Sequence, residues 1–133
     1  MKPPVVMDDP LFPEAARSLF VRLYGQPTVS RKVIAQRIDL QLEKIRKAAG
    51  DNVLIDLKVC ERVAESLKAL LEHGDAHTPR EHKLLIQAAA RYFLMEEDAQ
   101  DDLSSFVGFD DDAGVVNAVA RYLGRTDLIV EVL

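Results

Sequence analysis

The chain has 133 residues, 48% of them hydrophobic, so it can bury one sizeable core but not two. Its formal net charge of −5 argues against general nucleic-acid binding, because neutralising phosphates needs concentrated lysine and arginine. The single cysteine, Cys60, excludes an internal disulfide and a cysteine-based zinc cluster, which is typical of proteins in a reducing compartment. We therefore expect one cytoplasmic domain.

We expect neither a secretory leader nor a membrane span from this sequence. Residues 1–13 hold only the short apolar run Val5-Val6-Met7 before two aspartates, which is not the apolar stretch of a secretory signal. No uncharged apolar run reaches the roughly 18 residues that a spanning helix needs. We expect a soluble protein. Because prolines and aspartates lie in residues 1–13 without periodicity, we predict a flexible segment there and a single domain at residues 14–133.

Helical periodicity dominates the rest of the chain. Pro13 suits the first position of a short helix and Gly25 its end. A second helix begins after Thr28 or Ser30, either of which can cap it, and ends at Gly50. Its apolar residues recur every three or four positions, namely Ile34, Ile38, Leu42, Ile45 and Ala49.

A third and a fourth helix follow. Asp51 or Asn52 caps the third, which we expect to be the most buried because its apolar stripe is wide. That stripe holds Val53, Leu57, Val59, Cys60, Val63, Ala64, Leu67, Leu70 and Leu71. The fourth begins at Thr78-Pro79-Arg80-Glu81, where a hydroxyl cap, a proline and a glutamate able to bond to the cap's amide occur together. Its body ends on Tyr92-Phe93-Leu94.

A fifth helix starts at Asp110, which is a good cap, and stops at Gly124. Its apolar face holds Val115, Val116, Val119, Tyr122 and Leu123. Residues 127–133 form an apolar tail that can be one more helical turn or an extended segment. The pattern therefore predicts an all-α protein, a single compact domain of about five helices. Helices two and three are central in it, and an acidic turn joins helices four and five.

Charge is distributed unevenly along the chain. Residues 14–68 carry eleven lysines and arginines against seven carboxylates, whereas residues 69–133 carry five against thirteen. Eight of the twenty-two carboxylates fall between Glu96 and Asp112. Like charges this dense repel one another, so they are spread into water, neutralised by a cation or covered by a basic partner. Such a chain could also associate head to tail with its own copies.

Residues 92–116 carry the one recognisable pattern. Its fixed positions are Tyr92, Asp98, Asp102, Gly108, Phe109, Asp111 and Asp112. In this spacing the segment resembles the YkvA-like family of small uncharacterised bacterial proteins. Ala99-Gln100-Asp101 stands where that family usually has Leu-Ile-Pro, and Ser104-Ser105 replaces a second apolar-proline pair, which makes the segment more polar here. The resemblance implies a helical fold and a shared acidic turn, and it implies no reaction.

The acidic stretch is also the candidate metal site. Asp98 and Asp102 are four residues apart and would share one helix face, while Asp111 and Asp112 would open the facing helix across a tight turn. Converging carboxylates suit Mg²⁺, Mn²⁺ or Ca²⁺, which take oxygen ligands in numbers. The alternative is that Asp110 caps the helix, the next two aspartates sit where the helix dipole favours anions, and the others are solvated.

Other ligands and nucleophiles are sparse. His73, His77 and His82 have spacings suited to zinc, yet the boundary at Thr78 divides them between two helices and a loop. Cys60 falls on the apolar stripe of the third helix, as a small core residue would. Because no glycine-rich phosphate loop and no nucleophile elbow are present, we assign no catalytic or cofactor-binding residue and favour a protein that is not an enzyme.

We therefore expect a protein-interaction or adaptor module that presents an acidic helix-turn-helix surface. The residues expected on that surface are Glu96, Glu97, Asp101, Phe109 and Asp110. Its partner would be a protein with a basic or apolar surface, and the tail at residues 128–133 is a second candidate contact. The basic run on helix two, from Arg31 to Lys47, is interleaved with acidic residues and is expected to be a solvated face. The alternatives are a divalent-metal-binding protein, which could be hydrolytic, and an acidic inhibitor that mimics nucleic acid or blocks a basic toxin.

Overall fold

The structure is a computed structural model that describes residues 4–51, 57–73, 78–99 and 110–131, with the backbone alone at Asp51 and at residues 95–99. Over these ranges the chain is helical and contains no strand. The α-helices are α1 (Arg17–Tyr24), α2 (Arg31–Asp51), α3 (Leu57–His73), α4 (Arg80–Ala99) and α5 (Asp110–Tyr122). Three short 3-10 turns accompany them, at Val5–Asp8, Glu14–Ala16 and Thr126–Leu128.

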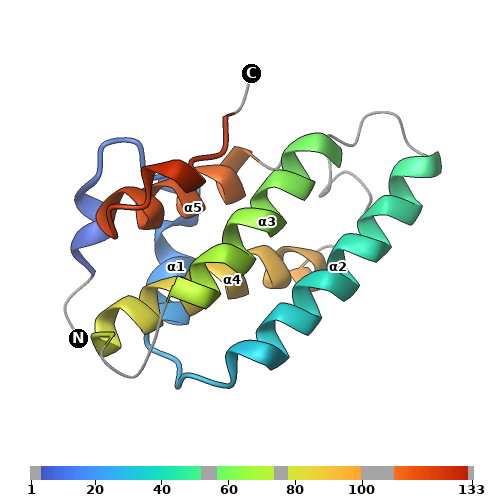
Figure 1. The fold of residues 1–133 in the computed structure, drawn as a ribbon. Helices are drawn as coiled ribbons and strands as arrows, with labels where there is room; N and C mark the ends of the chain where they lie inside the picture. Colours follow the sequence, from blue (N-terminus) through green and yellow to red (C-terminus); the bar gives the residue numbers. More distant parts are fainter. Residues whose placement is uncertain (1–3, 52–56, 74–77, 100–109, 132–133) are drawn as a thin grey trace.

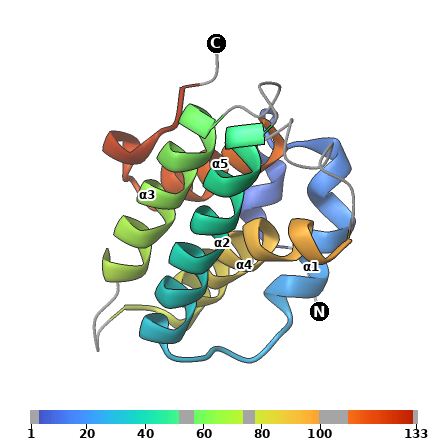
Figure 2. The ribbon, with the colours of Figure 1, turned by 90° about the vertical axis from the view of Figure 1, so that its right-hand side faces the viewer.

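The helices pack into one compact domain. α2 and α3 lie side by side along one edge of the molecule, and α4 runs behind them (Figure 1, Figure 2). α4 contacts each of the other four α-helices, while α5 packs on α3 and α4. The prediction of a single all-α domain of about five helices is confirmed, and α4 shares its centre with α2 and α3. No described helix combines the length and the apolarity that crossing a membrane requires.

Most helix ends follow the sequence signals. The backbone N–H groups of Val33 and Ile34 donate to the carbonyl of Ser30, so α2 starts where a cap was predicted. α2 runs one residue past Gly50 and ends at Asp51. Gly124 adopts a φ of 75°, and the N–H of Arg125 bonds to the carbonyl of Ala120 at 2.8 Å. This left-handed turn ends α5 as glycine after a helix commonly does.

The core is built from the predicted stripes. On α2 the side chains of Ile34, Ile38 and Ile45 are at most 2% exposed, and α3 contributes eight buried residues. On α4 the alanines at 88–90 are buried together with Tyr92 and Phe93. Because alanine side chains are short, the other helices can approach α4 closely, which explains how it contacts all of them.

The N-terminal segment differs from the flexible segment that the sequence predicts. Residues 4–13 pack against the core, with Val6, Met7 and Phe12 at 2%, 5% and 4% exposure. The Phe12 ring meets the Phe20 ring of α1 edge to face, with centroids 5.2 Å apart. On α5, a Cβ added at Gly114 would lie 2.5 Å from Cγ of Pro13. A larger residue there would clash with the proline ring, so glycine permits this close approach.

An ion pair also ties this segment to α5. Nε of Arg121 donates to Oδ2 of Asp9 at 2.7 Å. This hydrogen bond lowers the pKa of the Asp9 carboxyl below its usual value, against the opposing effect of burial. A carboxyl whose pKa is lower in the folded state stabilises the protein above the unfolded pKa and ceases to do so as the pH falls through the folded one.

We therefore expect Asp9→Asn to lower the free energy of unfolding at neutral pH by about 1–3 kcal/mol, since a hydrogen bond between charged groups is lost. The difference from the wild type should shrink as the pH falls below 3.8, the value of an ordinary aspartate. Urea unfolding at several pH values measures it. The exposed neighbour Asp8, changed to asparagine, is the control, and an equal response of both variants would contradict a specific role for Asp9.

The apolar tail combines both predicted conformations. A 3-10 turn at Thr126–Leu128 leads into an extended stretch. Oγ of Ser66 donates to the carbonyl of Leu128 at 2.7 Å. The amide of Asn117 bonds both backbone groups of Val130, at 2.7 and 2.9 Å, and the Val130 side chain is 2% exposed. The tail thus contributes to this protein's own core through Val130, and a partner could take up that side chain only after the tail had undocked.

Candidate functional site

The structure describes the side chains of only two of the four predicted metal ligands. Asp98 lies in the last turn of α4, where only the backbone is described, and Asp102 lies outside the described residues. Asp111 is partly buried and Asp112 is 1% exposed, both in the first turn of α5. Over the described residues, no group of three or more His, Cys, Asp or Glu side chains is placed to hold a metal ion. The four-aspartate site stays a prediction.

Of the five residues predicted for the acidic interaction surface, only Asp110 has a side chain that the structure describes. Glu96 and Glu97 lie on α4 with only their backbone described, and Asp101 and Phe109 fall outside the described residues. Asp110 is exposed at the start of α5. Successive residues of a helix point about 100° apart, so Asp110 faces solvent while Asp112 is buried. The three consecutive aspartates therefore do not form one uniformly solvated surface.

The two described histidines have separate surroundings. Nδ1 of His73 lies 3.1 Å from Nη1 of Arg125. His82 instead meets the ring of Tyr122 edge to face, with centroids 6.1 Å apart. His77 lies outside the described residues. Cys60 is fully buried, as predicted for a core residue.

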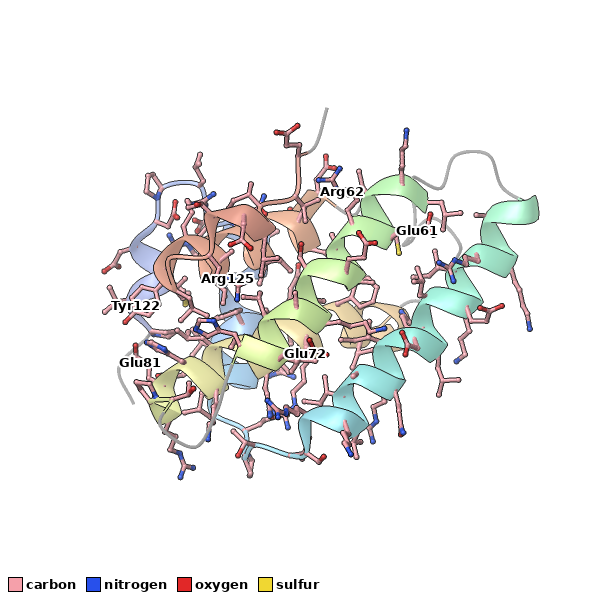
Figure 3. All side chains as sticks on the ribbon, in the orientation of Figure 1. Glu61, Arg62, Glu72, Glu81, Tyr122 and Arg125 are labelled. Atoms are coloured by element: carbon pink, nitrogen blue, oxygen red, sulfur yellow. The ribbon has the colours of Figure 1, made fainter. Side chains whose placement is uncertain are left out.

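Tyr122 joins the end of α5 to the start of α4. Its hydroxyl donates a hydrogen bond to Oε1 of Glu81, and the two side chains meet at one end of the molecule (Figure 3). This bond raises the pKa of Tyr122, while burial, with a smaller effect of the Glu81 charge, raises the pKa of Tyr24. Both phenols therefore stay protonated at neutral pH, which suits a structural role better than that of a base or nucleophile.

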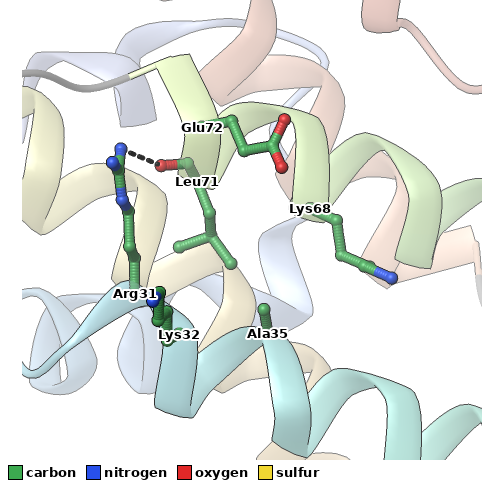
Figure 4. Close-up of a pocket in the computed structure, with 6 residues that line it drawn as sticks. All are labelled: Arg31, Lys32, Ala35, Lys68, Leu71 and Glu72. Carbon is green, nitrogen blue, oxygen red and sulfur yellow. Dashed lines mark hydrogen bonds between the residues drawn. The ribbon is translucent and has the colours of Figure 1, made fainter.

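A groove of about 400 Å³ lies between α2 and α3 (Figure 4). Its lining residues are Arg31, Lys32, Ala35, Lys68, Leu71 and Glu72. Although three of them are cationic, Lys68 pairs with Asp39 at 2.8 Å and Arg31 reaches the carbonyl of Leu71 at 3.5 Å. Glu72 adds a negative charge. Asp39 and Glu72 therefore offset part, but not all, of the positive charge that lines the groove.

The segment before α2 is fixed to α4 by two side chains. The side-chain amide of Gln87, which is 7% exposed, accepts from the N–H of Val29 at 3.0 Å and donates to its carbonyl at 2.8 Å. One helical turn further on, Nη2 of Arg91 donates to the carbonyl of Pro27 at 2.7 Å. Both contacts hold the backbone in place, and the Val29 side chain remains 46% exposed.

The outer side of α2 combines apolar and cationic side chains, which we call the α2 face. It consists of Val33, Arg37, Leu40, Lys44 and Lys47, all exposed. Their spacing of four, three, four and three residues places them in one line along the helix. Val33 is 41% exposed and Leu40 66%, although both are apolar. The sequence predicts a solvated basic face here, and the structure adds the exposed apolar side chains of Val33 and Leu40 to it.

On the flank of α2 that packs against α3, carboxylates form ion pairs with cationic side chains. Asp39 pairs with Lys68, and Glu61 pairs with Arg46 at 2.7 Å. By contrast, Arg37 makes no ion pair within the described ranges of the chain, and Arg91 bonds to a neutral carbonyl. Burial lowers the pKa of the Arg91 guanidinium, and the positive charge of Arg37 lowers it further. The charge of Arg37 therefore remains available to an anionic group of a partner.

Comparison with models of known protein families, with curated proteins and with solved structures finds no match. The likeness of residues 92–116 to the YkvA-like family stays a prediction.

Proposed function

We propose that this protein is a small protein-interaction module and that the α2 face is its contact surface. The observation that carries the proposal is the exposure of Leu40 and Val33 in one line on a helix whose opposite side is fully buried. Burying an exposed leucine or valine side chain contributes about 1.5–3 kcal/mol, so a partner that covers both gains binding free energy.

Rigidity of the surface supports this proposal. The contacts of Gln87 and Arg91 hold the segment before α2 on α4, which is itself at the centre of the fold. A surface that is already ordered loses less conformational entropy on binding. The sequence of residues 96–112 also predicts a second, acidic contact surface through which a basic partner could bind.

Photo-crosslinking in the cells that produce the protein tests the proposal. We expect Leu40→p-benzoylphenylalanine to yield a discrete crosslinked protein. The control is the same replacement at Leu11, which is 68% exposed and belongs to the N-terminal segment on the opposite side of the molecule from α2 (Figure 1). Equal yields at both positions, or none at position 40, would contradict the proposal.

The divalent-metal function is the second candidate. Two observations favour a metal site. α4 remains helical through Ala99 and α5 begins with three aspartates from Asp110, so both ends of the acidic stretch lie in helices. These two helices also pack on each other. Such an arrangement can bring carboxylates together from two elements.

If the metal site exists, millimolar Mg²⁺ or Ca²⁺ will raise the melting temperature, because a ligand that binds only the folded state stabilises it. The double variant Asp98→Asn with Asp102→Asn is expected to abolish the shift. Glu65→Gln with Glu131→Gln, which removes two carboxylates that lie elsewhere and are exposed, is the control. Thermal unfolding followed by circular dichroism measures this, and the absence of a shift with any divalent ion would remove the metal hypothesis.

A further inference from the structure

From the charge and shape of the α2 face we infer that its partner is an amphipathic helix with an apolar stripe flanked by carboxylates. This inference rests on the proposed interaction function and adds the chemistry of the partner. It starts from the alternation of apolar and cationic side chains, since Val33 and Leu40 are separated and followed by cations at Arg37, Lys44 and Lys47.

The geometry suits a helix. From Val33 to Lys47 the face extends for about 20 Å at the rise of an α-helix, which matches four turns of a partner helix. The steps of four and three residues are those with which one helix inserts side chains between those of another. The described ranges contain no strand whose edge could take up an extended peptide. The α2 face therefore suits a partner helix better than a partner strand.

The charge pattern specifies carboxylates. Arg37 is exposed and forms no ion pair within the described part of the chain, whereas Asp39 and Glu61 already pair with Lys68 and Arg46 on the flank that faces α3. A partner carboxylate opposite Arg37 would neutralise its charge and accept hydrogen bonds from its guanidinium group. Leucines of the same helix would cover Val33 and Leu40, which are 41% and 66% exposed.

Nucleic acid is a poorer occupant of this surface. Its phosphates would meet the cations but would leave Val33 and Leu40 without an apolar partner. The α2 face contains no aromatic side chain on which a base could stack. The whole chain, at a net charge of −5, repels a polyanion, while a short helix with a few carboxylates responds mainly to the local charges.

The test compares two designed helical peptides of about 18 residues, alike except that one carries glutamates beside its leucine stripe and the other lysines. Fluorescence anisotropy with the full chain should show tighter binding of the glutamate peptide, although net charge alone would favour the lysine peptide. Arg37→Glu should weaken the binding of the glutamate peptide by about tenfold, and Leu40→Asp should weaken it similarly. Arg62→Glu, the same charge change at an exposed site on α3, should leave the affinity unchanged.

Failure of this inference can be told from failure of the proposed function. If Leu40→p-benzoylphenylalanine crosslinks a partner in cells while the glutamate peptide binds no better than the lysine peptide, the interaction module stands and the partner chemistry is wrong. An unchanged affinity of Arg37→Glu, or equal loss with Arg62→Glu, also overturns the inference. Circular dichroism of each variant checks that the fold is retained.

Discussion

Phe12→Ala is expected to lower the free energy of unfolding by about 3–5 kcal/mol, the usual cost of truncating a buried phenylalanine. Phe12 is 4% exposed and packs edge to face on Phe20, a fully buried residue of α1. The guanidinium carbon of Arg17 also lies 5.9 Å from the centroid of the Phe12 ring. Removal of the ring would therefore leave a cavity and a cation without its aromatic partner.

Urea unfolding followed by circular dichroism measures this effect. The neighbouring Leu11→Ala is the control, because Leu11 is 68% exposed and a surface substitution usually changes stability by no more than about 0.5 kcal/mol. If Phe12→Ala were as stable as Leu11→Ala, the N-terminal segment would not belong to the core, and the flexible segment predicted from the sequence would be the better description.

Gln87→Leu is expected to destabilise the protein and to release the segment before α2. Leucine keeps the volume of the side chain but leaves the N–H and the carbonyl of Val29 without the partners they have at 3.0 and 2.8 Å. A fully buried backbone group that loses its partner costs about 1–3 kcal/mol, and the two groups of Val29 are partly buried. Because water can enter as the segment detaches, we expect the lower part of that range for each group.

Two measurements separate the global effect from the local one. Urea unfolding reports the loss of stability, and amide hydrogen exchange at Val29 reports the local opening, which should become much faster than exchange in the middle of α4. Gln26→Leu, the same substitution at an exposed position, is the control. Unaltered protection of the Val29 amide in Gln87→Leu would show that the segment is held by other contacts.

The sequence predicted the parts of the fold that are determined locally. The buried stripe of α2, the start of α4 near Pro79 and the end of α5 at Gly124 each depend on residues within a few positions of one another. The docking of Val6, Met7 and Phe12 was missed because they lie in short 3-10 turns, whose few residues show no helical period. Their burial depends on contacts with helices far along the chain.

The candidate surface was harder to predict than the fold. Gln87 and Val29 are 58 residues apart, so no local pattern joins them. Val33 and Leu40 were hidden by the stronger apolar stripe of the same helix, and only the orientation of α2 in the fold shows that they face outward. The three consecutive aspartates that begin α5 look alike in the sequence. In the fold, however, the side of α5 that carries Asp112 packs inward, and Asp110 is exposed.

The most direct test of the central claim compares photo-crosslinking yields from three positions in the same cells. p-Benzoylphenylalanine would replace Leu40 on the α2 face, Asp110 at the start of α5, or Leu11 as the exposed control. The interaction module proposed here predicts the highest yield at position 40 and little more than background at position 11. A crosslinked partner at position 110 with none at position 40 would contradict it, because the acidic stretch would then be the contact surface.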